Sequence, residues 1–197
     1  EVSDEFVKEL KNNIPELPDD KKKRFIDEFK LSPYEATILV SDIETSKYFE
    51  EVVAKMGKNK DNKLAVNWMT GELFAVLNDK NLDISQSPVS AKNLAILVNL
   101  IKNGTISGKI AKTVFEFMID GDQDPQKIVE EKGLKQQSDP KALEALIDKI
   151  INDNREKAIE YKNGKEKLFG FFVGQAMKAS GGKANPQLIN EILKKKL

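Results

Sequence analysis

Apolar residues recur along this chain three or four positions apart, in runs that are separated by short polar, glycine- or proline-containing stretches. This spacing places the apolar side chains on one face of a helix. No run of strictly alternating apolar and polar residues is long enough to predict a strand. The pattern therefore predicts an all-α fold, built as a helical bundle-like domain followed by a small basic helical domain.

Capping residues and prolines mark the starts of the expected helices. Ser32-Pro33, Ser107 and Ser138-Asp139-Pro140 each precede an apolar run with helical spacing. Trp68 stands in a run that has apolar residues on nearly every face, which predicts a central helix and a buried indole. The first helix is expected to begin at Ser3 or Asp4, and two more are expected after Gly164. Between them, helices are expected near 19–29, 33–43, 44–56, 64–77, 90–101, 107–118, 125–131 and 140–151.

The chain has 197 residues and no net charge, but its charge is unevenly distributed. Residues 154–197 hold ten Lys or Arg against four Asp or Glu, and the remainder carries the compensating acidic excess. A polar, turn-rich stretch between Gly121 and Asp139 precedes this change in charge. These features predict a helical domain over 1–130 and a tail domain over 131–197, and a basic tail of this kind indicates an anionic partner.

Composition excludes several kinds of chemistry. The chain contains no cysteine and no histidine, which removes the thiolate nucleophile, the commonest general base and the commonest metal ligand. We therefore expect no catalytic residue and no metal site. Residues 104–112 are expected to form a turn followed by the start of a helix, which is either a phosphate site or a capped helix corner. The spacing of a P-loop is missing, and this favours the capped corner. The helix after this turn offers apolar side chains rather than base-reading ones, which argues against a DNA-binding helix-turn-helix.

The last part of the chain has an unusual pattern, because glycines interrupt a helical run. Gly170 and Gly174 lie four residues apart, on one helix face, and lysines stand close to them. Each glycine costs a helix about 1 kcal/mol relative to alanine, so a compensating role is expected. Two roles stay open: close packing of two helices, or a thin backbone beside positive charge that contacts phosphate or RNA.

The same segment, KEKLFGFFVGQAMKASGGKANPQLINEILKKKL, resembles the tail of the B subunits of tRNA-dependent amidotransferases, a tail that small YqeY-type proteins share. Three further segments are similar to the same family: NGTISGKIAKTVFEFMIDGDQDPQKIVEEKGLKQQSD, AVNWMTGELFAVLN and PELPDDKKKRFIDEFKLSPYEATILVSD. The resemblance therefore extends over nearly the whole chain. The first residue is Glu rather than Met, and we expect a piece of a longer protein that lacks the family's large catalytic domain.

The resemblance implies a function in translation. Subunits of this family belong to a heterotrimer with an amidase A subunit and a small C subunit, which converts glutamate or aspartate mischarged on tRNA for Gln or Asn into the amide. ATP and magnesium act in the missing domain, so no cofactor is expected here. The implied tRNA contacts, carried over by position in the tail motif, are Lys165, Lys167, Gln175, Lys178, Lys183 and Asn185.

Three functions remain as hypotheses at this point: the tRNA-binding portion of such a B subunit, an enzyme in its own right, and a helical protein–protein interaction module. The absence of His, Cys and a P-loop argues against the second. No apolar stretch approaches the roughly 20 residues that a membrane helix needs. We expect no membrane partner, and a cytoplasmic protein of bacterial type or its organellar counterpart.

Overall fold

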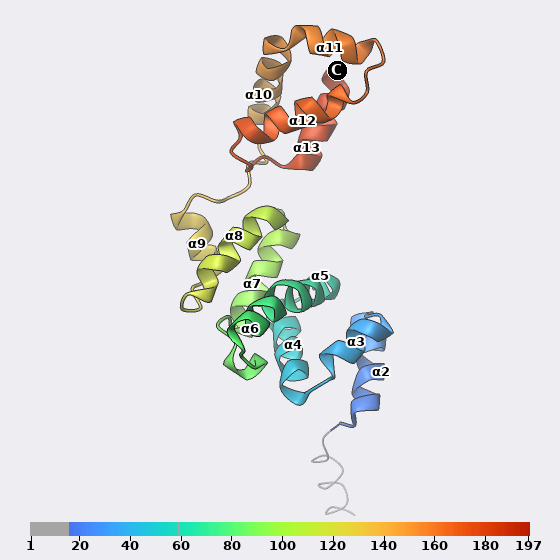
Figure 1. The fold of residues 1–197 in the computed structure, drawn as a ribbon, viewed down its shortest axis with the longest axis vertical. Helices are drawn as coiled ribbons and strands as arrows, with labels where there is room; N and C mark the ends of the chain where they lie inside the picture. The colour runs from blue at the N-terminus through green and yellow to red at the C-terminus, as the bar shows by residue number, and fades with distance from the viewer. Residues whose placement is uncertain (1–15, 59) are drawn as a thin grey trace, which may run out of the picture. The chain divides into compact units, whose positions relative to one another are not determined.

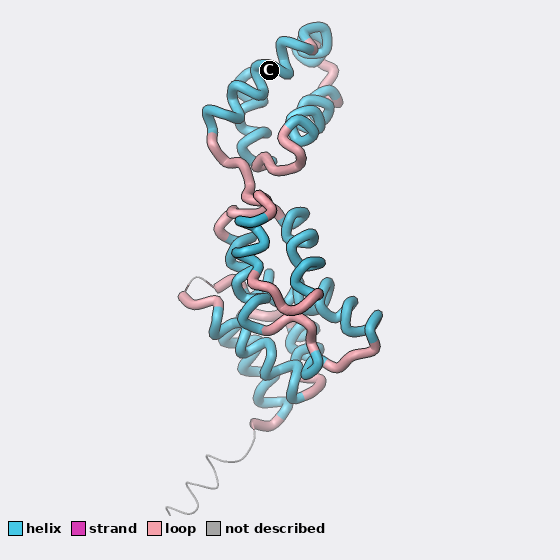
Figure 2. Tube along the Cα trace, turned by 90° about the vertical axis from the view of Figure 1, so that its left-hand side faces the viewer, coloured by secondary structure: helices cyan, strands magenta, loops and turns pink. Residues whose placement is uncertain are grey.

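Residues 16–58 and 60–197 are described by a computed structural model of the protein. The regular elements of this part of the chain are helices, joined by loops (Figure 1 and Figure 2). The one β-type pairing among these residues is an isolated parallel bridge between Gln137 and Ala184. The predicted all-α fold is therefore confirmed. The helix expected to start at Ser3 or Asp4 lies outside the described residues.

Contacts between residues divide the chain into two compact units, Glu1–Ala95 and Ile96–Leu197. The division falls inside helix α7 (Ala91–Lys102). The boundary expected between residues 130 and 131 stays a prediction.

The first unit is built around a cluster of aromatic rings and a central helix. Phe25, Phe29 and Phe49 lie with their ring centroids 5.2 to 5.4 Å apart, in edge and tilted geometries that stabilise aromatic pairs. Trp68 is only 7% exposed, so its predicted place in the core is confirmed. The elements of this unit are α2 (Pro18–Phe29), α3 (Pro33–Leu39), α4 (Ile43–Lys55), α5 (Asn62–Trp68), η1 (Met69–Leu73), α6 (Phe74–Lys80) and η2 (Ile84–Gln86).

Local side-chain chemistry fixes where α3 and α4 begin. Ser32 accepts a hydrogen bond from the backbone N–H of Glu35 at 3.2 Å, and the Glu35 carboxylate accepts one from the Ser32 N–H at 2.8 Å. This reciprocal pair is a capping box. The expected single helix over 33–43 is wrong, because α3 ends at Leu39 and Asp42 caps a new helix. Ile43, expected on a buried face, is the first residue of α4 and is 65% exposed.

The long central helix expected near residues 64–77 contains a feature that helical spacing does not reveal. Between α5 and α6 the backbone forms the π-helical turn η1, over Met69–Leu73. Such turns insert one extra residue into a helix and shift the side chains beyond it. Met69 and Leu73 are both fully buried, so η1 is part of the packed core of the first unit.

The second unit repeats the pattern of short capped helices. Ser107, Asp139 and Asn185 each accept a hydrogen bond from a backbone N–H at the start of a helix, as the sequence predicted for the first two. The elements after α7 are α8 (Gly108–Ile119), α9 (Pro125–Glu131), α10 (Pro140–Asp153), α11 (Arg155–Lys162), α12 (Leu168–Ala179) and α13 (Pro186–Lys196). Helix α11 was not expected, because it buries only Ala158 and has little apolar periodicity.

Helices α10 to α13 lie next to one another (Figure 1), and their apolar side chains form a core of their own. Phe172 and Ala176 of α12 are fully buried there, against residues of α10 and α13 such as Leu143 and Ile189. The segment before α10 is tied to the loop between α12 and α13. The N–H of Gln137 donates to the Lys183 carbonyl at 2.7 Å, and the N–H of Asn185 donates to the Gln137 carbonyl at 3.1 Å. These bonds hold the loop at 180–185 in place.

The capping box of α3 generates a prediction about pH. The ammonium of Lys63, at 2.8 Å, and the donors of Ser32 hold the pKa of the Glu35 carboxyl below its usual value. Because the folded-state pKa is lowered, the ionised Glu35 carboxyl stabilises the fold above the unfolded-state pKa of about 4.3. This stabilisation is lost as the pH falls through the folded-state pKa. We expect Glu35→Gln to lower the free energy of unfolding by about 1 kcal/mol or less at pH 7.

Urea unfolding of the parent and the variant, followed from pH 7 down to pH 3, measures this effect. The difference between them should shrink as the pH falls below the unfolded-state pKa of about 4.3, and it should close as the pH falls through the lower folded-state pKa of Glu35. Glu51→Gln is the matched control, since Glu51 is exposed on α4 and has no ion pair within the described residues. A difference that is equally large at pH 3 would show that charge at Glu35 is not what stabilises α3.

Candidate nucleic-acid interface

Helix α12 has two chemically different faces. Phe172 and Ala176 point into the core of α10–α13, whereas four exposed positions line the opposite side. These positions are spaced by three, four and four residues, which places them on one helix face. We call this face the glycine–lysine stripe; it consists of Lys167, Gly170, Gly174 and Lys178. Lys167, which directly precedes α12, and Lys178 lie ~16 Å apart along the helix axis.

The structure argues against one of the two roles that the sequence left open for the glycines. A Cβ atom added at Gly170 or Gly174 would meet nothing within 4 Å. Close packing of helices within the described residues therefore does not require glycine at either position. Gly181 and Gly182 are different, because their φ angles of 61° and 77° lie in the left-handed region that favours glycine. Gly170 and Gly174 are thus left without an intramolecular reason.

The other predicted contact residues have more restricted surroundings. Lys165 is exposed, and its ammonium lies 2.8 Å from the Glu160 carboxylate. Lys183 is half-buried in the loop at 180–185. The side-chain oxygen of Asn185 accepts hydrogen bonds from the N–H groups of Gln187 and Leu188 at the start of α13, so this side chain is a helix cap. The structure brings Lys167 and Lys178 onto one face with the glycines and leaves Lys165 in an ion pair.

Gln175 and Lys178 also line a pocket of about 440 Å³ between α10 and α12. Its other wall comes from α10, where Lys149 and Asp153 lie four residues apart on one face. The sequence did not single out these two residues. The spacing of Lys149 and Asp153 beside Leu146 and Ile150 is typical of the polar edge of an amphipathic helix. The amino-acid sequence does not show that this edge lies opposite Gln175. The polar groups of this pocket therefore come from two helices of the tail.

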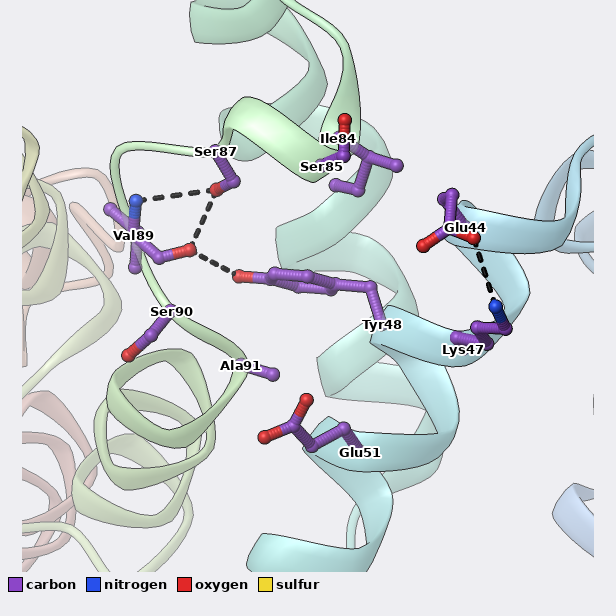
Figure 3. A pocket seen from close by; sticks show the side chains of 10 residues that line it. All are labelled: Glu44, Lys47, Tyr48, Glu51, Ile84, Ser85, Ser87, Val89, Ser90 and Ala91. Atoms are coloured by element: carbon purple, nitrogen blue, oxygen red, sulfur yellow. Dashed lines mark hydrogen bonds and ion pairs between the residues drawn. The ribbon is translucent and has the colours of Figure 1, made fainter.

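A second pocket lies in the first unit, and several of its polar groups bind one another (Figure 3). The Tyr48 hydroxyl donates to the Val89 carbonyl at 2.7 Å, and the Ser87 hydroxyl donates to the same oxygen at 2.6 Å. Lys47 pairs with Glu44 at 2.9 Å. The hydrogen bonds join α4 to the segment before α7. We interpret this pocket of about 370 Å³ as a structural junction.

A local contact explains the turn and helix start at 104–112. Ser107 accepts a hydrogen bond from the Ile110 N–H at 3.2 Å, so the turn before α8 is the capped corner that the spacing favoured. Within the described residues, no group of three or more Asp or Glu side chains is placed to hold a metal ion. No helix in that same part of the chain is long and apolar enough to cross a membrane.

Comparisons with known proteins agree with the resemblance of the tail. Residues 47–197 match the family described as the GatB domain. The whole chain is 88% identical to the B subunit of the aspartyl/glutamyl-tRNA(Asn/Gln) amidotransferase of Pelagibacter ubique, over 40% of that protein's length. It is 50% identical to proteins of the same name from Zymomonas mobilis and Rickettsia africae, over 41% and 40% of their lengths. The chain thus spans about two fifths of these relatives.

The open space around the stripe generates a prediction about stability. Gly170→Ala and Gly174→Ala should each raise the free energy of unfolding by about 1 kcal/mol, because alanine is the better helix former and its methyl group meets no neighbour. Gly181→Ala is the matched control; it should lower stability by about 1 kcal/mol, since its φ of 61° disfavours any side chain. Chemical unfolding measures all three. A Gly174→Ala variant that is less stable than the parent would show that this face is packed.

Proposed function

The chain belongs to the GatB domain family, and we propose that it forms the tRNA-binding C-terminal portion of an aspartyl/glutamyl-tRNA(Asn/Gln) amidotransferase B subunit. In this role it holds a tRNA that carries glutamate or aspartate and positions it for conversion of that residue to the amide. The observation that carries the proposal is the glycine–lysine stripe. Two lysines flank two helical glycines that nothing within the described part of the chain requires.

Physical chemistry connects this face to RNA. A lysine that contacts a phosphate releases condensed counterions, which is the main source of affinity for nucleic acids. Between the lysines, the glycines remove side chains that would hold a sugar–phosphate backbone away from the helix. The net charge of +6 over residues 154–197, ten basic against four acidic residues, attracts the same ligand from a distance.

The aromatic residues of the tail are engaged within the protein, so phosphate, sugar and shape contacts would dominate recognition. Phe172 is fully buried, and the Phe171 ring is covered by the ammonium of Lys157 at 3.8 Å. Phe169 lies beside Tyr161, with ring centroids 6.0 Å apart. Recognition of this kind suits a folded RNA better than a single strand that stacks on exposed rings.

The proposal assigns the chemical steps to the part of the subunit that this chain does not span. ATP-dependent activation needs a magnesium and phosphate site, and the described residues offer neither a metal-binding group of acidic side chains nor a P-loop. In the assembled enzyme, the partners would be the amidase A subunit and the small C subunit, together with tRNA for Gln, Asn or both. The residues of the tail would bind and orient the RNA.

The test is the affinity of this chain for tRNA across a range of salt concentrations. Lys178→Ala and Lys183→Ala should each weaken binding, and the double variant should weaken it further. Each lost phosphate contact should make the slope of log affinity against log salt shallower by about 0.7 to 0.9. Neither change should alter stability by more than about 0.5 kcal/mol, because both lysines lie at or near the surface.

Lys127→Ala is the matched control, since Lys127 is an exposed lysine on α9, outside the basic tail. It should leave both the affinity and the salt slope close to those of the parent. If the double variant binds tRNA as tightly as the parent at every salt concentration, the two lysines form only a solvated face. If the parent does not bind tRNA at all, a helical protein-interaction module becomes the better description of this chain.

A further inference from the structure

The pocket between α10 and α12 combines aliphatic, charged and amide side chains. On α10 it is lined by Leu146, Lys149, Ile150 and Asp153, which recur at the spacing of one helix face. Gln175 and Lys178, three residues apart, line it from α12. Aliphatic side chains thus lie beside a carboxylate, two ammonium groups and an amide. The pocket volume of about 440 Å³ is within the range of small-ligand sites, roughly 300 to 1,000 Å³.

Four polar side chains of this pocket are not used by the protein itself, whereas a fifth, the Asn154 amide, donates to the Ile150 carbonyl at 2.9 Å. Lys149, Asp153 and Lys178 form no ion pair within residues 16–58 and 60–197, although other lysines of the tail do. Lys165 pairs with Glu160, and Lys196 lies 2.6 Å from Asp148. The half-buried amide of Gln175 likewise has no hydrogen-bond partner among the described residues. Donors and acceptors are therefore free for a ligand.

The mixture of charges restricts what the ligand can be. Two ammonium groups and one carboxylate disfavour a cation in the pocket, and the Asp153 carboxylate would repel a phosphate bound there and offset part of its attraction to the lysines. A neutral, flat heterocycle avoids both repulsions and can contact the aliphatic side chains with its faces. RNA loops present unpaired bases whose Watson–Crick and Hoogsteen edges proteins read by hydrogen bonds.

Among the bases, guanine complements this set of groups best. Its N1–H and N2–H₂ donors lie side by side and match the two oxygens of one carboxylate, as in other bidentate pairs. Its O6 and N7 acceptors match the ammonium donor of Lys149 and the amide donor of Gln175, which leaves Lys178 for the phosphate contact. Adenine, in contrast, offers the carboxylate only one donor group on its Watson–Crick edge.

We propose that the pocket between α10 and α12 holds one unpaired guanine of the bound RNA, with Asp153 accepting from its N1–H and N2–H₂ groups. This inference rests on the proposed function, since it names what a single nucleotide does at the same RNA-binding face. Lys178 lies both on the glycine–lysine stripe and at the pocket, so a backbone that runs along the stripe passes the pocket opening.

The decisive variant is Asp153→Asn, because simple electrostatics and the proposal predict opposite results. Removal of a negative charge near RNA should strengthen non-specific binding. If Asp153 holds a guanine, the variant should instead bind tRNA more weakly, by about fivefold or more, the loss expected for a bidentate base contact. The salt slope should stay unchanged, since no phosphate contact is lost. Asp120→Asn, at the exposed end of α8, is the matched control and should not weaken binding.

The second arm changes the RNA. A set of tRNAs for Gln that lack the natural base modifications is prepared. In each tRNA of the set, inosine, which lacks the N2 amino group, replaces one unpaired guanosine. One position should weaken binding to the parent protein about fivefold or more and have no further effect on Asp153→Asn. Folding is verified by the unfolding curve, which should be unchanged or better for Asp153→Asn, because a carboxylate in the last turn of α10 opposes the helix dipole.

The outcomes separate this inference from the proposed function. If the parent binds tRNA, and Asp153→Asn binds as tightly or more tightly with the same response to inosine, the guanine pocket is wrong and the proposed function stands. If no single inosine weakens binding to the parent, the pocket again does not read guanine. If the parent does not bind tRNA in any form, both the proposed function and the pocket are overturned.

Discussion

Burial of Phe172 and Ala176 against α10 and α13 is the interaction on which the candidate RNA-binding face depends. It fixes the rotation of α12 about its own axis, and so decides which positions of that helix reach solvent. With Phe172 inward, Gly170, Gly174 and Lys178 point outward, and Gln175 turns toward α10. A side-chain contact in the core thereby creates both the glycine–lysine stripe and one wall of the pocket.

The second constraint acts through the backbone. The segment before α10 is hydrogen-bonded at Gln137 to both sides of Ala184, which ties down the loop that carries Lys183. Gly181 and Gly182 let the chain turn there with left-handed φ angles. Of the predicted contact residues in this loop, Lys183 is half-buried and Asn185 caps α13. Lys165 is ion-paired with Glu160, whereas Lys167 and Lys178 remain free on the surface.

The sequence predicted those features that depend on neighbours along the chain. Ser32 and Asp139 were found as caps because a capping side chain bonds to backbone only two or three residues away. Helix α11 was missed because it buries almost nothing except Ala158, and the π turn at Met69–Leu73 because it preserves a helical pattern on either side. The presence of Asp153 and Gln175 in the same pocket depends on tertiary packing, which no local sequence pattern reveals.

The most direct test uses the eleven glycines of the chain as reporters. The protein is labelled with ¹⁵N only at glycine, and the amide resonances are followed while tRNA is added. If α12 is the RNA-binding face, the signals of Gly170 and Gly174 should shift or broaden first, whereas those of Gly57 and Gly71 in the first unit should change little. Shifts at Gly57 and Gly71 with no change at Gly170 and Gly174 would contradict the account.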